Sequence, residues 1–308
     1  MKRWLAPVVA APGLAAWPAH AHMAGEEFSW WLVDPLALVL LLLVAIAYWR
    51  GSADKASRPQ ADSGRFRQRR WFFWSGWTIL ILSLASPLDP LGEQLFSAHM
   101  VQHELIMLVA APLLVLSRPS AALLRGFPAW LGWLVGAILR PSGLRSFWSW
   151  LASPLVAWMI HALVLWGWHL PALFSAGLES TLVHVLQHLS FLWVGLLFWW
   201  ALWRSRSRGS AAGVLYLFTT AIHASVLGAL LTFSPAVWYS PYLATAPSWG
   251  ISALADQQLG GLIMWMPSGL VYIGAALVEV NAYLRTSGRH ARQRDIARGA
   301  EIQHVRQK

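Results

Sequence analysis

Seven long apolar stretches run through this chain. Most of them approach the ~20 apolar residues that a membrane-spanning helix needs. In lipid, a helix satisfies its own backbone hydrogen bonds, which an isolated strand cannot do. The pattern therefore predicts an all-α polytopic membrane protein, a seven-transmembrane-helix bundle. The predicted spans are residues 31–49, 71–86, 96–116, 151–170, 181–203, 211–233 and 257–283.

The composition agrees with a membrane protein and limits the chemistry. Only 12% of the residues are charged and 57% are hydrophobic, whereas about a quarter of a soluble domain is charged. The 22 tryptophans also fit, because indole rings favour the membrane interface. The chain has no cysteine, which excludes disulfides, thiolate metal sites and iron–sulfur clusters. Metal chemistry would have to use histidine and methionine.

The basic residues predict the orientation. Apart from Lys2 and Arg3, every lysine and arginine lies in one of four segments, and the connections that alternate with them contain none. Cytoplasmic loops of membrane proteins are enriched in these residues. We therefore expect the N-terminus outside and the C-terminus inside the bacterial inner membrane, and we explain the net charge of +10 without a nucleic-acid partner. The four basic segments are 50–70, 117–150, 204–208 and 285–308.

Residues 1–21 have the pattern of a secretory signal peptide. Lys2 and Arg3 precede a short apolar stretch, and Ala19-His20-Ala21 forms an A-x-A cleavage site. Cleavage would leave His22 at the N-terminus, where its amine and imidazole could chelate copper.

The remaining chain divides into a membrane domain and a tail. Residues 22–284 form the predicted seven-helix domain, and 285–308 a basic cytoplasmic tail that can rest on anionic lipid. Within the domain, 121–148 is expected to lie along the cytoplasmic interface as one or two helices. The aromatic connection 234–256 is expected to pack on the outer end of the bundle as a lid.

A histidine motif occurs twice. His99–His103 and His184–His188 both read H-x-x-Q-H, and residues four apart lie on one helix face, ~6 Å from each other. Both predicted helices run in the same direction, so the two pairs should lie at similar depth. Each is followed by a returning helix that carries a His-Ala pair, beginning at His161 and at His223. The chain thus contains a tandem two-helix repeat, and such repeats often build a site at their interface.

Six histidines at membrane depth favour a metal site. Ionisable groups within the bilayer are costly and usually face the bundle interior, although one histidine alone could simply bridge two helices. We expect His99, His103, His184 and His188 to form a primary site. His161 and His223 would form a deeper second ligand set.

Other side chains extend the list of candidates. Imidazole suits copper, zinc and haem iron alike, while histidine with methionine and no cysteine favours copper. His169 is about 80° round its helix from His161 and should not bind the same ion. The possible additional metal ligands are Met100, Met264, Met266, His169 and His22. Glu104 and Asp256 are expected to orient a metal-binding side chain by accepting a hydrogen bond from it.

The ordered set of motifs resembles the CtaG family of multi-helix assembly factors for caa-type cytochrome c oxidase. The resemblance covers roughly 30–285 and implies a role in oxidase maturation, usually proposed to be copper delivery. Its partners would be a haem–copper oxidase subunit and a periplasmic copper chaperone. The motifs are Leu88-Asp89-Pro90, His99–His103, Ala111–Leu114 with Arg118-Pro119, His184–His188, His223 with Leu230–Phe233, and Asp256–Gly261.

Three alternatives to a copper-delivering assembly factor stay open at this point. Paired histidines could ligate haem, as in a b-type cytochrome or a haem-handling factor. The deeper histidines could line the pathway of a copper transporter, or the whole chain could be a structural scaffold. An enzyme is not expected, because the sequence has no Walker A motif, G-x-S-x-G elbow or Rossmann fingerprint in a suitable context.

Overall fold

The computed structural model describes residues 35–53, 63–139, 141–206 and 212–306. The described part is helical and contains no strand, which confirms the all-α part of the predicted fold class. The signal peptide and His22 lie outside the described residues. The helices are α1 (Pro35–Ala53), α2 (Ser63–Leu84), α3 (Leu88–Gln94), α4 (Phe96–Glu104), the π-helix η3 (Leu105–Ala110), α5 (Ala111–Ser117), α6 (Ser120–Gly126), α7 (Ala129–Leu139), α8 (Ser142–Leu151), α9 (Pro154–Trp168), α10 (Pro171–Glu179), α11 (Thr181–Arg206), α12 (Ala212–Thr232), α13 (Tyr242–Thr245), the 3-10 helix η4 (Ala246–Trp249) and α14 (Ala253–Arg306).

Several helices are long and apolar enough to cross a membrane, as predicted. Four described helical stretches meet this condition alone: Phe96–Ser117, Thr181–Arg204, Ala212–Thr232 and Ala253–Arg285. Two bent pairs, α2 with α3 (42°) and α8 with α9 (65°), raise the number to six if each pair is one span. The apolar part of α1, Leu38–Ala53, is shorter. The described residues therefore support four to six spans, and seven stays a prediction.

Prolines explain where the chain bends. Pro87 stands at the bend between α2 and α3, and Pro154 begins α9 after the bend from α8. Proline lacks the N–H that a continuing helix needs but fits the first turn of a new one. In the segment 121–148, Pro128 and Pro141 separate three short helices, α6, α7 and α8, where one or two were expected.

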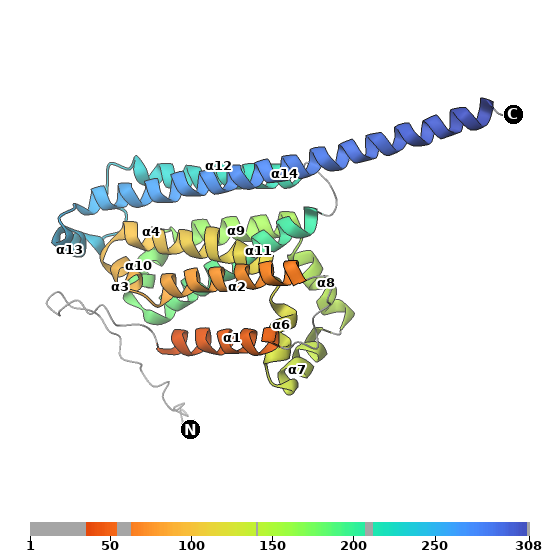
Figure 1. The fold of residues 1–308 in the computed structure, drawn as a ribbon. Helices are drawn as coiled ribbons and strands as arrows, with labels where there is room; N and C mark the ends of the chain where they lie inside the picture. The colour runs from red at the N-terminus through yellow and green to blue at the C-terminus, as the bar shows by residue number, and fades with distance from the viewer. Residues whose placement is uncertain (1–34, 54–62, 140, 207–211, 307–308) are drawn as a thin grey trace, which may run out of the picture.

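The long helices lie side by side, with the short ones at their ends (Figure 1). The helix α14 packs against α12 and α4, and α11 packs against α9 and α5. The α12–α14 contact depends on small residues: a Cβ added to Gly261 would lie 2.6 Å from the backbone nitrogen of Thr232 and 2.7 Å from the carbonyl oxygen of Gly228. Beyond the bundle, α14 continues as one helix to Arg306 (Figure 1).

The outer surface of the bundle is apolar. Leu163, Leu215 and Leu270, on three different helices, are each more than 60% exposed. A soluble protein rarely exposes so many large apolar side chains. The aromatic and aliphatic core, by contrast, lies between α4, α9, α11, α12 and α14. This distribution fits a bundle that is surrounded by lipid.

Candidate metal centre

The two histidine motifs begin in the same local structure. A short helix, α3 or α10, ends at one extended residue, Leu95 (φ −131°, ψ 125°) or Ser180 (φ −136°, ψ 117°). A longer helical stretch, Phe96–Ser117 or Thr181–Arg206, begins at the next residue, and its fourth residue is the first histidine of the motif, His99 or His184. Because this local geometry is repeated, both histidine pairs lie in the first two turns of their helices.

The four histidines of the motifs lie together in one cluster, which we call the histidine tetrad. Ring centroids are 4.3 Å apart within each pair, His99–His103 and His184–His188. Between α4 and α11, the distances are 5.6 Å for His99–His184, 6.0 Å for His99–His188 and 5.3 Å for His103–His188. All four side chains are buried, with exposed fractions of 1% for His99, 4% for His103, 8% for His188 and 9% for His184.

Most ring nitrogens of the tetrad have no hydrogen-bond partner among the described residues. This holds for both nitrogens of His103 and for Nε2 of His184 and His188. The nitrogens of His99 also lack a partner of good hydrogen-bond geometry in the described chain, although the backbone of Gly92 and the side chain of Gln187 lie nearby. Burying such atoms unpaired is costly, and a native protein that does so calls for an explanation. A bound cation would satisfy several of them at once, because neutral imidazole is a metal ligand.

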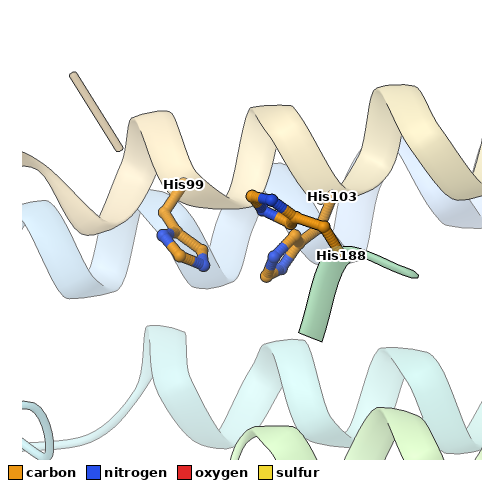
Figure 2. A group of neighbouring side chains, drawn as sticks. All are labelled: His99, His103 and His188. Carbon is orange, nitrogen blue, oxygen red and sulfur yellow. The ribbon is translucent and has the colours of Figure 1, made fainter. Parts of the chain in front are cut away.

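Three of these histidines are spaced closely enough to share an ion. Figure 2 shows His99, His103 and His188 projecting into one space. One ligand nitrogen from each lies within 4.8 Å of the other two. Metal–nitrogen bonds of ~2.0 Å place two ligands of one ion up to ~4 Å apart. Small side-chain rotations would therefore bring the three nitrogens onto a single ion.

Asp89 also belongs to this centre, although the sequence did not single it out as a ligand. One oxygen of Asp89 and one nitrogen each of His184 and His188 lie within 4.8 Å of one another. Gln102, the glutamine of the first motif, donates from Nε2 to Asp89 Oδ1 (2.6 Å) and to the carbonyl oxygen of Ser83 (2.7 Å). The motif thus supplies two histidines and holds a carboxylate beside two more.

Two glycines extend the repeat. Gly92 and Gly177 each stand seven residues before the first histidine of their motif. A Cβ at Gly92 would lie 3.3 Å from both Gln102 Oε1 and His99 Cα, and one at Gly177 would lie 3.1 Å from Gln187 Oε1. Both positions require close approach of the short helix to the motif glutamine. The sequence signal that could have found them is G-x6-H-x-x-Q-H, present in both copies.

His161 and His223 form a separate pair. Their ring centroids are 5.7 Å apart, and their aromatic neighbours are Phe198 (4.7 Å from His161) and Trp158 (5.5 Å from His223). Nδ1 of His161 and both nitrogens of His223 have no hydrogen-bond partner in the described chain. No ring contact between described residues joins the pair to the tetrad. The six predicted histidines are thus a group of four and a group of two.

Of the other predicted ligands in the described chain, the methionines lie in the apolar core or on the outside of the bundle, and His169 is close enough to interact electrostatically with His99 and His103. Met100 (1% exposed) and Met264 (2%) belong to the apolar core, and Met100 Cγ lies 3.2 Å from a Cβ built on Gly260 of α14. Met266 is 55% exposed on the outside of α14. His169 Nδ1 is 2.7 Å from the carbonyl oxygen of Leu165 in its own helix. The possible thioether ligands stay a prediction.

The two predicted orienting carboxylates behave differently from expectation. Asp256 is fully buried and caps α4: it accepts hydrogen bonds from the backbone nitrogens of Phe96 (2.6 Å) and Ser97 (3.1 Å), and from Ser97 Oγ (2.5 Å). It positions the first histidine helix rather than a histidine ring. Glu104 Oε2 has no hydrogen-bond partner among the described residues, and neither nitrogen of His103 has one, so Glu104 does not orient that ring.

The connection 234–256 packs over one end of the bundle, as expected of a lid. Its Tyr239 and Tyr242 are each 1% exposed and donate hydrogen bonds to the carbonyl oxygens of His169 (3.0 Å) and Gly92 (2.8 Å). Burial raises the pKa of both phenols above their ordinary value, so they stay protonated donors. Gln257 of α14 holds the start of this connection by accepting from the backbone nitrogen of Trp238 (2.6 Å).

Comparison with known proteins shows one matching family. The sequence model described as cytochrome c oxidase caa3 assembly factor matches residues 46–286. This range contains every described element except the first part of α1 and the end of α14. No solved structure matches the chain.

Similar proteins occur in mycobacteria. Uncharacterized proteins of Mycobacterium bovis and Mycobacterium tuberculosis are 28% identical over 281 residues, which is 86% of this chain and 41% of theirs. An uncharacterized protein of Mycobacterium leprae is 25% identical over 292 residues, 87% of this chain and 41% of its own length. The chain therefore spans about two fifths of the length of these relatives.

Proposed function

Because the chain belongs to the family of cytochrome c oxidase caa3 assembly factors, we propose that it binds copper in the histidine tetrad and delivers it to a nascent haem–copper oxidase subunit. The observation that carries this proposal is the set of buried ring nitrogens without hydrogen-bond partners in the described chain, grouped within the reach of one ion. Copper is the cargo of this protein and not its permanent cofactor. No catalytic step is assigned to the chain.

The donor set suits a protein that must release its metal. With no cysteine in the chain, the site is made of neutral imidazoles, which bind copper and other late transition metals. Thiolates would add charge and hold a soft ion more firmly. Protons compete with metal for imidazole, so exposure of the site to water on contact with a partner would help release.

The proposed topology puts the tetrad on the side of the membrane from which copper arrives. We place seven spans in the bacterial inner membrane, with the N-terminus outside after removal of the signal peptide. The motifs lie at the beginnings of α4 and α11, while Arg118 follows the end of the α4–α5 stretch and Arg204 is near the end of α11. The positive-inside rule then puts the tetrad toward the periplasm, within reach of a copper chaperone there.

A copper transporter is the second candidate, and the pair of His161 and His223 is the observation that favours it. Two further imidazoles, a buried one at His161 and a partly buried one at His223, have ring nitrogens without a partner among the described residues and could form a second binding position for an ion moving inward. A transporter would carry copper into vesicles that contain no oxidase. An assembly factor would not. For haem, the ring-centroid distances of 4.3–6.0 Å that join neighbouring members of the tetrad suit a single ion better than a macrocycle placed between the rings.

The test is complementation of a bacterial strain that lacks this gene. The double variant His99→Ala/His184→Ala removes one ligand from each motif, and we expect the copper content and activity of its oxidase to fall about tenfold or more. Haem in the oxidase should stay at the level of the wild-type strain. The matched control is His290→Ala in the predicted cytoplasmic tail. This variant should restore both the copper content and the activity of the oxidase. Normal oxidase copper in the double variant would contradict the proposal.

A further inference from the structure

The tetrad and Asp89 together offer two donor sets rather than one. The first consists of His99, His103 and His188, and the second of Asp89, His184 and His188. We propose that these are two overlapping cation positions that share His188: an all-imidazole position for monovalent ions and a carboxylate-containing position for divalent ions. This inference rests on the proposed function, because it describes how the same centre handles its metal.

The geometry of His188 makes it the common member. Its ring centroid is 5.3 Å from that of His103, 6.0 Å from that of His99 and 4.3 Å from that of His184. Asp89 and His184 complete one set, and His99 and His103 complete the other. A ring nitrogen has one lone pair, so a given nitrogen of His188 can bind one ion at a time. An ion could pass from one position to the other without leaving His188.

Electric charge distinguishes the two positions. The desolvation cost of an ion rises with the square of its charge, so a divalent ion costs about four times as much as a monovalent one of the same size. Three neutral imidazoles do not offset this cost with opposite charge, whereas the carboxylate of Asp89 does. The all-imidazole position should therefore prefer Cu(I) or Ag(I), and the position with Asp89 should prefer Zn(II), Co(II) or Cu(II).

The members of the two positions differ in burial. Asp89 is only partly buried, and His184 and His188 are 9% and 8% exposed. His103 and His99 are 4% and 1% exposed. The carboxylate position therefore contains the one member of the centre that is only partly buried.

Gln102 supports the carboxylate position in a specific way. Its Nε2 donates to Asp89 Oδ1 (2.6 Å), and this bond fixes the carboxyl group beside His184 and His188. Asp89→Asn keeps the shape and an amide oxygen for Gln102 while it removes the charge. This makes it a suitable variant for testing charge without removing the side chain.

The experiment measures Zn(II) and Ag(I) affinities of the purified full-length chain in detergent. We expect Asp89→Asn to weaken Zn(II) binding about tenfold or more and to change Ag(I) affinity less than about threefold. His184→Ala, which leaves Asp89 in place, should give the same result. His103→Ala should do the opposite and weaken Ag(I) while it spares Zn(II). In the wild type, Zn(II) and Ag(I) should compete, because both need His188.

Three results would overturn the inference. Equal weakening of both ions by Asp89→Asn and His103→Ala would indicate one undivided site. Unchanged Zn(II) affinity in both Asp89→Asn and His184→Ala would remove the second position. If the wild-type chain bound neither ion, this inference and the proposed copper site would fail together, whereas the first two results would leave the copper site intact.

Discussion

Replacing His188 with alanine is expected to weaken copper binding by the purified protein at least about 100-fold. His188 belongs to both donor sets and its ring lies within 6.0 Å of the other three rings of the tetrad, so no complete set survives without it. The measurement is a competition titration of Cu(I) against a coloured chelator, with the protein in detergent.

The fold should tolerate His188→Ala. Nε2 of His188 has no hydrogen-bond partner in the described chain. The substitution therefore breaks no hydrogen bond at Nε2, and it removes a buried polar atom whose desolvation is costly. We expect the thermal unfolding temperature to stay within a few degrees of the wild-type value. The control His290→Ala should bind copper normally. Wild-type copper affinity in His188→Ala would contradict the two overlapping donor sets.

The second large effect is expected at Asp256, which caps α4. Asp256→Ala would leave three buried donors without their acceptor: the backbone N–H groups of Phe96 and Ser97 and the hydroxyl of Ser97. Each such loss costs about 1–3 kcal/mol, so we expect the free energy of unfolding to fall by about 3 kcal/mol or more. Denaturant unfolding in detergent measures this change.

The same substitution should also weaken metal binding, because α4 carries His99 and His103. Asp256→Asn is the matched control: it retains an acceptor oxygen and loses the charge, so its destabilisation should be smaller than that of alanine. If Asp256→Ala unfolded within about 0.5 kcal/mol of the wild type, the capping role assigned to this carboxylate would be wrong.

Local patterns in the sequence predicted the helices and the motif pairs well. Apolar length predicted membrane helices because a spanning helix needs little beyond ~20 apolar residues. The H-x-x-Q-H spacing predicted that His99 and His103 share a helix face, and their ring centroids are 4.3 Å apart. The lengths of α2 and α14 were less predictable. Both extend into basic segments, since arginine is a good helix former and hydropathy marks only the apolar part.

The partners of each motif could not be predicted, because they depend on packing between distant segments. Asp89 meets His184 across almost a hundred residues of chain, and Asp256 caps a helix that begins 160 positions earlier. Neither contact leaves a periodic signal. The possible methionine ligands stay a prediction: Met100 is about 100° round the helix from His99 and lies beside Gly260 of α14.

The central claim is tested most directly by the metal and haem content of the purified wild-type chain and of the His99→Ala/His184→Ala double variant. Our account predicts that the wild type retains or takes up about one copper ion per chain, shows no Soret absorption, and loses its copper in the double variant. A strong Soret band with little copper, or equal copper in both proteins, would contradict it.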